Sequence, residues 1–460
     1  MAALRRRNNR NAAGAWAFAL NCCAVTRRWR GVRCQSCHLL FLDPMDPRDL
    51  SFRPVFAFQF AIANFGAFLG CLPILAILVP MKAQEIDPGG SSDLLSWTIM
   101  LGALVASSVN LAAGWLSDLT SSRIGRRKPW IVAGSVLTIT SYALVLSAST
   151  RVQLVGAVIV LQAAFNIMLP SLIALLPDEV PDARKGLVAA LLAVGAPLGL
   201  GVGAFLMGIS TLSLSQRLAL PGGLMVVCIL PLLLFWKERA GSDIRRQEVS
   251  KVVIEAKVSE AVVAEDRWRD FWRIWWSRFF VQIAFSVCQS YLLLFLIRAR
   301  QLADVGSGLP AETVAGRLLL VSTSLSLLVA VLIGAVTDRF GRRKLFVVAA
   351  GFFVAAGMGL MAAQPTLTGF VLGQLLYGVG VGLYSSAEVA LAAELLPTRL
   401  HAARDLAVLN IGNAVPQAIA PALALAIIGN YGAGYSVLFG AGCLSAIVGG
   451  LIAARIRTAK

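Results

Sequence analysis

More than half of the 460 residues are hydrophobic (58%) and only 14% are charged, which excludes a soluble globular domain and predicts an integral membrane protein. In a soluble chain, the formal net charge of +17 would suggest a nucleic-acid partner. In a membrane protein, we expect this charge to set topology and attract anionic lipid, and we predict no nucleic-acid partner.

Residues 1–54 are predicted to form a cytoplasmic, disordered N-terminal tail. The tail contains CQSCH at residues 34–38, which matches the pattern for c-type haem attachment. Attachment takes place outside the cytoplasm, so haem is not expected. Zinc binding by Cys34, Cys37 and His38 is one alternative, and translation starting at Met45 is another. We predict no metal and no cofactor for the protein.

Twelve apolar runs follow, and many of them reach the roughly 20 residues that a helix needs to cross the hydrocarbon core. In chain order they are 55–80, 94–117, 130–149, 152–175, 187–209, 219–236, 278–297, 314–337, 345–363, 366–396, 406–428 and 432–454. The predicted fold is therefore all-α and integral to the membrane. It has a six-helix bundle at 55–236, a cytoplasmic linker at 237–277 and a second six-helix bundle at 278–460.

Lysine and arginine are distributed unevenly between the two sides of the membrane. With the N-terminus inside, 35 of the 41 cations fall in inner segments and 6 in outer segments. By the positive-inside rule, this asymmetry predicts a multi-pass protein of the cell membrane with both termini in the cytoplasm.

The two predicted bundles are related in sequence. Gly114 and Gly334 are 220 residues apart, as are Asp118 and Asp338, and Pro177 with Pro397 repeats the offset. Because each copy has an even number of spans, both have the same orientation, which predicts parallel repeats about an axis along the membrane normal.

A doubled charged motif lies between the second and third span of each half: GWLSDLTSSRIGRRKP at 114–129 and GAVTDRFGRRK at 334–344. Six plus six spans with this motif resemble the major facilitator superfamily over roughly residues 50–460. The longer spacing in the first copy resembles the sucrose and related glycoside-cation symporter branch. The resemblance implies transport by alternating access.

The resemblance also implies that the motif is a conformational latch, which holds the cytoplasmic mouth shut and is broken when the halves rock. Its glycines are expected to allow close helix approach, and its aspartates to pair with adjacent arginines and with a helix N-terminus of the opposite half. The alternative is that the cations are only topology anchors. The predicted latch residues are Gly114, Asp118, Arg123, Gly125, Arg126, Arg127, Gly334, Asp338, Arg339, Gly341, Arg342 and Arg343.

Glu388 is an ionisable group deep in the tenth predicted span, about 12 Å from its cytoplasmic end by helical rise. A charged carboxylate at that depth is costly, which favours proton uptake and predicts a proton-coupling role. The alternative is a structural carboxylate hydrogen-bonded to Tyr384 or Ser385.

Several amide and phenol side chains within the spans are candidates for a central substrate cavity. They suit a neutral polyhydroxyl ligand, but such groups also bond helix to helix. The candidates are Gln59, Asn64, Gln162, Asn166, Gln289, Gln374, Tyr377, Asn410 and Asn413. Pro197, Pro416 and Pro421 are expected to bend the fifth and eleventh spans.

No Walker-type phosphate loop is present, and paired carboxylates are missing from the spans, so we predict a transporter and not an enzyme. The leading hypothesis is a monomeric, proton-coupled symporter of a small solute, with a sugar or glycoside favoured by the resemblance. One alternative is drug efflux by proton antiport, suggested by GAPLGLGVG at 195–203. Another is a membrane sensor that does not transport.

Overall fold

The computed structural model describes residues 54–122, 124–236, 264–302, 308–340, 343–394, 402–430 and 434–457. Within these ranges every regular element is helical, and the described residues all belong to one compact unit, Phe52–Lys460. The predicted all-α membrane fold is confirmed. The motif CQSCH and nearly all of the predicted tail lie outside the described residues.

The first half consists of six membrane-spanning segments, several of them broken. The first comprises α2 (Pro54–Leu69), η2 (Ile74–Leu78) and α3 (Val79–Ile86), and it is followed by α4 (Ser91–Leu119) and α5 (Lys128–Ser147). The fourth comprises α6 (Arg151–Ile173) and α7 (Leu175–Glu179), the fifth α8 (Asp182–Ala193) and α9 (Gly195–Met207), and the sixth is α10 (Leu214–Phe235).

The second half repeats this order with longer helices. They are α12 (Ala264–Leu302), α13 (Ala311–Phe340), α14 (Arg343–Ala363), α15 (Leu367–Glu394), α16 (Ala402–Ala424) continued by η4 (Leu425–Asn430), and α17 (Gly434–Ala454). Among the described residues, eleven segments are long and apolar enough to span a bilayer, and α16 with η4 supplies a shorter apolar helix, Val415–Ile428. The twelve predicted spans correspond to these segments.

Helix α12 begins earlier than the sequence analysis expected. The linker was expected to end at 277, but α12 starts at Ala264 and includes the tryptophan-rich stretch 268–276. No glycine or proline interrupts the segment, so nothing ends the helix there. Its 39 residues correspond to about 58 Å of helix, well beyond the hydrocarbon thickness. The boundary at 277 therefore does not interrupt the secondary structure.

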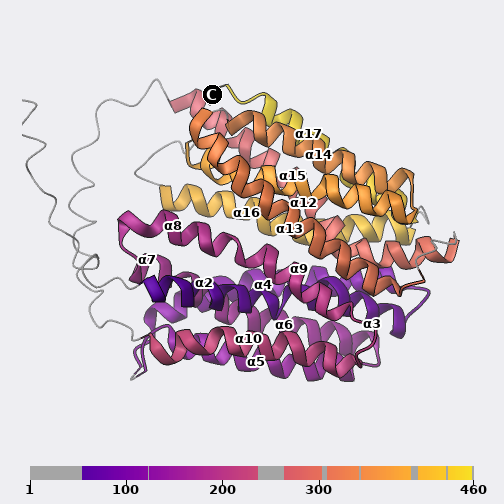
Figure 1. Ribbon diagram of the computed structural model, residues 1–460, viewed down its shortest axis with the longest axis horizontal. Coiled ribbons are helices and arrows are strands. Elements are labelled where there is room, and N and C mark those ends of the chain that lie inside the picture. The colour runs from indigo at the N-terminus through magenta and orange to yellow at the C-terminus, as the bar shows by residue number, and fades with distance from the viewer. Residues whose placement is uncertain are drawn as a thin grey trace, which may run out of the picture. The chain divides into compact units, whose positions relative to one another are not determined.

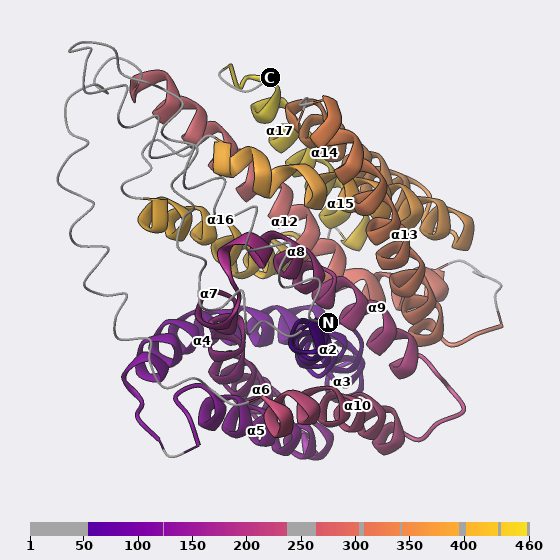
Figure 2. The same cartoon turned by 60° about the vertical axis from the view of Figure 1, so that its left-hand side comes forward.

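Two groups of helices are distinguished by colour in Figure 1, with α2–α10 in indigo to magenta and α12–α17 in red to yellow. Within each group the helices pack at close range. A Cβ atom added to Gly351 of α14 would lie 2.9 Å from the Cα of Gly450 on α17. Such contacts between small residues bring helix backbones together in lipid. Between the groups, α9 contacts α13 and α4 contacts α16, and Figure 2 shows α9 beside α13.

Local sequence explains where several helices start and break. Helix α6 opens with a capping box in which Thr150 and Gln153 satisfy each other's backbone N–H groups, and α10 has the same arrangement at Ser213 and Gln216. The fifth span breaks at Val194, three residues before Pro197. Proline lacks an N–H and its ring clashes with the carbonyl four residues earlier, so the predicted bend is confirmed there.

Candidate functional site

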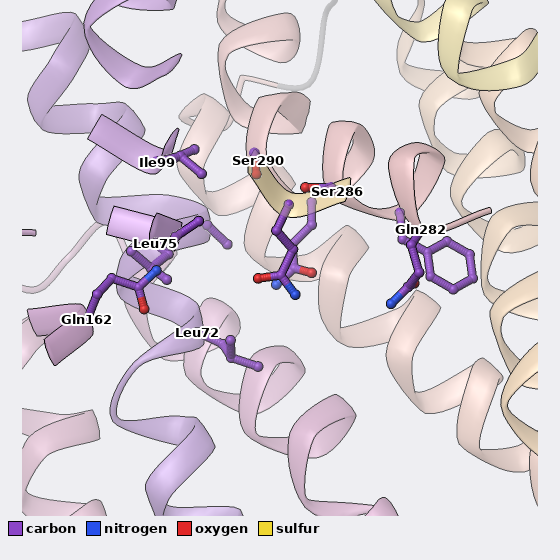
Figure 3. Close-up of a pocket in the computed structure, with 12 residues that line it drawn as sticks. Leu72, Leu75, Ile99, Gln162, Gln282, Ser286 and Ser290 are labelled. Carbon is purple, nitrogen blue, oxygen red and sulfur yellow. The ribbon is translucent and has the colours of Figure 1, made fainter. Parts of the chain in front are cut away.

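A pocket of about 300 Å³ lies between the two halves. Figure 3 shows Gln162 on one side of it and Gln282, Ser286 and Ser290 on the other. The lining residues are Leu72, Leu75, Ala76, Ile99, Ala103 and Gln162 from the first half, and Gln282, Phe285, Ser286, Gln289, Ser290 and Gln417 from the second. All are neutral. The polar groups are amides and hydroxyls, which both donate and accept hydrogen bonds.

Two of the predicted cavity residues, Gln162 and Gln289, line this pocket. Three others bond one helix to another: the Asn64 amide donates to the Leu192 carbonyl (2.8 Å), Asn166 accepts from Asn110 (3.0 Å), and Gln374 donates to the Cys288 sulfur (3.3 Å). These three side chains therefore hydrogen-bond one helix to another, which was the alternative to a role in the cavity.

The remaining predicted cavity residues are placed elsewhere. Gln59 is half-buried on α2 outside the pocket lining, and Tyr377 packs edge-on against Phe285 with ring centroids 5.8 Å apart. The side chain of Asn410 lies outside the described residues. Asn413 is not among the lining residues, but its side-chain oxygen accepts a hydrogen bond from the amide of the lining residue Gln282 (3.1 Å).

Asn413 joins the pocket to a buried ion pair. Its Oδ1 also accepts from Nε of Arg278 (2.8 Å), and Nη2 of Arg278 lies 3.3 Å from Oε2 of Glu388. The Glu388 side chain is 3% exposed and that of Arg278 is 13% exposed. A continuous set of polar contacts therefore runs from pocket residue Gln282 through Asn413 and Arg278 to Glu388.

The partners expected for a structural Glu388 are wrong. The Ser385 hydroxyl donates to the Val381 carbonyl, and the Tyr384 hydroxyl has no hydrogen-bond partner among the described residues. The real partner, Arg278, is the first residue of the predicted seventh span, and the sequence analysis only counted it among the inner cations. One carboxylate oxygen of Glu388, Oε1, is buried without a described hydrogen bond. Glu388 thus has both a counter-charge and an unused acceptor.

The two halves are joined by polar contacts at one end, which we call the far end, where α3 gives way to α4 (Ile86–Ser91). The hydroxyls of Ser96 and Tyr291 lie 2.6 Å apart, and the Thr313 hydroxyl donates to the Gly208 carbonyl (2.5 Å). Arg217 adds an ion pair with Glu312 at 3.5 Å. All of these contacts cross from the first half to the second.

Glycines at the far end permit this approach. A Cβ on Gly208 would lie 2.8 Å from the carbonyl oxygen of Glu312, and one on Gly316 would lie 3.1 Å from the carbonyl carbon of Ala204. A side chain on Gly208 would collide with the Glu312 carbonyl oxygen, and one on Gly316 with the carbonyl oxygen of Ala204. Helices α9 and α13 are thus in backbone contact where the segment GAPLGLGVG ends.

The opposite end, where α4 gives way to α5 (Leu119–Lys128), carries the first charged motif, and we call it the motif end. Arg127 is nearly buried and pairs with Asp118 (2.6 Å) and Asp178 (3.1 Å), while Arg126 pairs with Asp178 at 3.0 Å. Gly125 has φ +114°, a conformation that favours glycine and lets the chain turn into α5. The expected pairing of Asp118 with an adjacent arginine is confirmed.

The expected close approach at the motif glycines belongs to the state in which the motif end is shut, and it stays a prediction. A Cβ on Gly114 would lie 3.7 Å from Pro170 of its own half, an ordinary contact, and one on Gly334 would have none of the described atoms within 4 Å. Among the described residues, Asp118 is paired only within the first half, and its side chain is 51% exposed. In the part of the chain that the structure describes, the hydrogen bonds and ion pairs between the halves lie at the far end.

The other predicted latch residues are only partly described. Arg123, Gly341 and Arg342 lie outside the described residues, as do the side chains of Asp338 and Arg339, whereas Arg343 begins α14 and is half-buried. The latch role of both motif copies remains a prediction.

Replacing Asp178 by asparagine should destabilise the first half. Two guanidinium groups would lose a charged acceptor, and charge-assisted hydrogen bonds contribute about 1.5–3 kcal/mol each when shielded from water. We expect a loss of about 1–3 kcal/mol in the free energy of unfolding, measured by thermal unfolding of the purified protein. Asp118→Asn is the matched control, because its exposed pair with Arg127 is worth at most about 1 kcal/mol. An equal loss in both variants would contradict this ranking.

Sequence reasoning missed most of the pocket although a signal was present. Four polar residues of α12 follow the i, i+4, i+7, i+8 pattern of a single helix face: Gln282, Ser286, Gln289 and Ser290. Only Gln289 of this row was selected. A polar stripe in an otherwise apolar helix was the available signal.

Two six-helix halves around a neutral polar pocket, with contacts between the halves concentrated at one end, define the architecture of a membrane transporter. The sequence model for the Major Facilitator Superfamily matches residues 56–311 and 303–460, and the chain belongs to that family. Membership makes it a transporter of small molecules and a multi-pass membrane protein. No curated protein matches the chain.

Solved structures share the fold at low sequence identity. A peptide transporter of the POT type in complex with sulfate is 14% identical, with a TM-score of 0.65, and the match covers 88% of this chain and 94% of that one. A POT family transporter bound to 5-aminolevulinic acid is 14% identical (TM-score 0.64; 87% and 95% covered). A bacterial homologue of the human lysosomal transporter Spinster, inward-facing and occupied, is 15% identical (TM-score 0.58; 88% and 95% covered).

Proposed function

We propose that the protein is a monomeric secondary active transporter of the cell membrane that carries a neutral polyhydroxyl solute, a sugar or glycoside, together with a proton. The observation that carries the proposal is the pocket, whose described lining offers six amides and hydroxyls and no charged side chain. Such a lining matches the donors and acceptors of a sugar and offers no counter-charge to an ionic solute.

The contacts between the halves support alternating access. With both termini in the cytoplasm, the far end faces outward and is closed by Ser96–Tyr291, Thr313–Gly208 and Arg217–Glu312. The motif end then faces inward, with Asp118 exposed and paired within its own half. In this view the structure is an inward-facing state, and the latch forms in the opposite state, when the motif end closes.

The path from the pocket to Glu388 supports proton coupling. A solute that hydrogen-bonds to Gln282 changes the partners of Asn413, and Asn413 holds Arg278 beside Glu388. When Arg278 moves away, Glu388 loses its counter-charge and takes up a proton, because an unpaired carboxylate is costly within the membrane. Solute binding and protonation are thereby linked through one arginine.

The test is uptake of radiolabelled mono- and disaccharides into proteoliposomes containing the purified protein. We expect accumulation that collapses when the pH gradient is dissipated. Gln289→Leu should raise KM about tenfold or more, because a buried polar partner of the solute is lost. Leu234→Gln, on the exposed surface of α10 outside the pocket, is the control and should leave KM unchanged.

Two results would replace this proposal with an alternative. Resistance of expressing cells to lipophilic cations, without sugar uptake, would favour efflux by proton antiport. Sugar binding without flux in either direction would favour a sensor.

A further inference from the structure

A second pocket, of about 430 Å³, lies at the motif end of the second half, away from the solute pocket. It forms where α12, the start of α14 and the end of α17 meet. Its lining comprises Arg273, Lys344, Ala454, Arg455, Ile456 and Arg457. Four of these six residues are cations, and they come from three separate helices or their immediate ends.

The cations are held in place by contacts that leave two of them available. Lys344 donates to the Ile456 carbonyl (2.6 Å), and Arg273 donates to the buried Asp270 (2.6 Å). The other oxygen of Asp270 accepts from the backbone N–H of Arg457 (2.9 Å). Within the described residues, the guanidinium groups of Arg455 and Arg457 are not paired with any carboxylate. Among the described residues that line or contact this pocket, one carboxylate faces four cations, and the side chains of Arg455 and Arg457 are exposed.

The corresponding place in the first half is closed. In both motif copies the residue after the two arginines is a lysine that caps the last helix of its half. Lys128 donates to the Leu233 carbonyl (3.0 Å), as Lys344 does to Ile456. Trp236 covers Lys128, with its ring centroid 5.4 Å from the ammonium, and is buried itself. The open basic pocket is therefore a property of the second half and not of the repeated fold.

Apolar side chains extend from the cations toward the membrane. Leu451 lies in the last turn of α17, four residues before Arg455, and is exposed. Trp276 lies three residues after Arg273 on α12 and is also exposed, as is Leu345 next to Lys344. Tryptophan at this depth is typical of the membrane interface. A charged pocket bordered by exposed apolar side chains matches a molecule with an anionic head and an acyl tail.

We propose that this pocket binds the phosphate headgroup of an acidic phospholipid, with its acyl chains along Leu451 and Trp276. The phosphate diester is held by Arg455 and Arg457, whose planar guanidinium groups match phosphate oxygens. Lys344 and Arg273 add positive potential from the pocket wall. The occupant belongs to the membrane leaflet at the motif end, and the site is independent of the transported solute.

The experiment is titration of the purified, delipidated full-length protein with phosphatidylglycerol or phosphatidylcholine, followed by native mass spectrometry. We expect phosphatidylglycerol to bind and phosphatidylcholine to bind at least about tenfold more weakly. The double variant Arg455→Gln with Arg457→Gln should weaken phosphatidylglycerol binding about 30-fold, because each of the two cations near the lipid surface contributes roughly fivefold to the affinity. Arg455→Lys with Arg457→Lys retains the charge and should retain most of the binding.

The control is Arg184→Gln with Lys185→Gln, which removes two cations at the same end of the first half and should leave binding unchanged. Equal affinity for both lipids, or equal losses in the control and the Arg455/Arg457 variant, would overturn the proposal. A third result would also overturn it: millimolar inorganic phosphate displaces the lipid and stabilises the protein as much as the lipid does. The pocket would then be a site for a free anion. Size-exclusion profiles matching the unmodified protein establish that each variant is folded.

Discussion

Glu388→Gln should abolish solute accumulation driven by a pH gradient while leaving solute exchange across the membrane measurable. The glutamine cannot carry a proton, so the gradient no longer drives the solute, but the pocket side chains remain intact. The same change leaves Arg278 buried without its counter-charge. Because arginine cannot lose its charge, we expect a loss of about 3–5 kcal/mol in the free energy of unfolding. Uptake and exchange assays in proteoliposomes and thermal unfolding measure the two effects.

The reciprocal change, Arg278→Gln, separates a coupling role from a structural one. It should cost less stability than Glu388→Gln, because the remaining carboxylate can take up a proton. The double variant should regain much of the stability, since no buried charge is left unpaired. If Glu388 couples protons, the double variant still fails to accumulate solute. Recovery of accumulation along with stability would show that Glu388 is only structural.

Gly316→Val should open the far end and reduce transport. The added side chain would collide with the Ala204 carbonyl on α9, across the contact between the halves. Overpacking of this kind costs about 1–3 kcal/mol, and here the cost applies only to the state in which the far end is closed. The ratio of the two states should therefore shift roughly 5- to 150-fold toward the state with the far end open.

Labelling measures this shift. Ser92→Cys, introduced at a buried position of the far end after the native cysteines have been replaced, should react faster with a membrane-impermeant maleimide in the Gly316→Val background. Gly156→Val is the matched control, because Gly156 also lies toward the far end and an added Cβ there would have no atom within 4 Å. Equal labelling rates in the two backgrounds would show that α9 and α13 do not gate the far end.

The transmembrane segments were predictable because the bilayer imposes a local rule. Each run of apolar residues must satisfy its own backbone hydrogen bonds, so length and hydropathy identify a span without knowledge of its neighbours. The break of the fifth span near Pro197 was predictable for a similarly local reason. The start of α12 was missed because the expected linker was read from its charges, whereas the uninterrupted helix formers after Ala264 continue the helix.

The candidate site was less predictable. Glu388 was selected because its charge conflicts with its depth, but Arg278 was not selected because only the tertiary structure brings α12 and α15 together at this pair. Close approach by glycine was expected at Gly114 and Gly334 when the motif end is shut, and the structure shows a close approach at Gly208 and Gly316 that was not expected. All four glycines lie in membrane helices or directly at a helix end, and the sequence does not say which end of the halves is in contact.

The sequence by itself determined the membrane class, the spans and the duplicated halves, because hydropathy and internal repetition are properties of neighbouring residues and of spacing along the chain. The tertiary structure alone decided which polar groups face a pocket, which carboxylate meets which arginine, and which end of the molecule is closed. These features depend on contacts between helices distant in the chain. In a medium that exerts little hydrophobic force between helices, such contacts are set by shape and hydrogen bonding across the whole assembly.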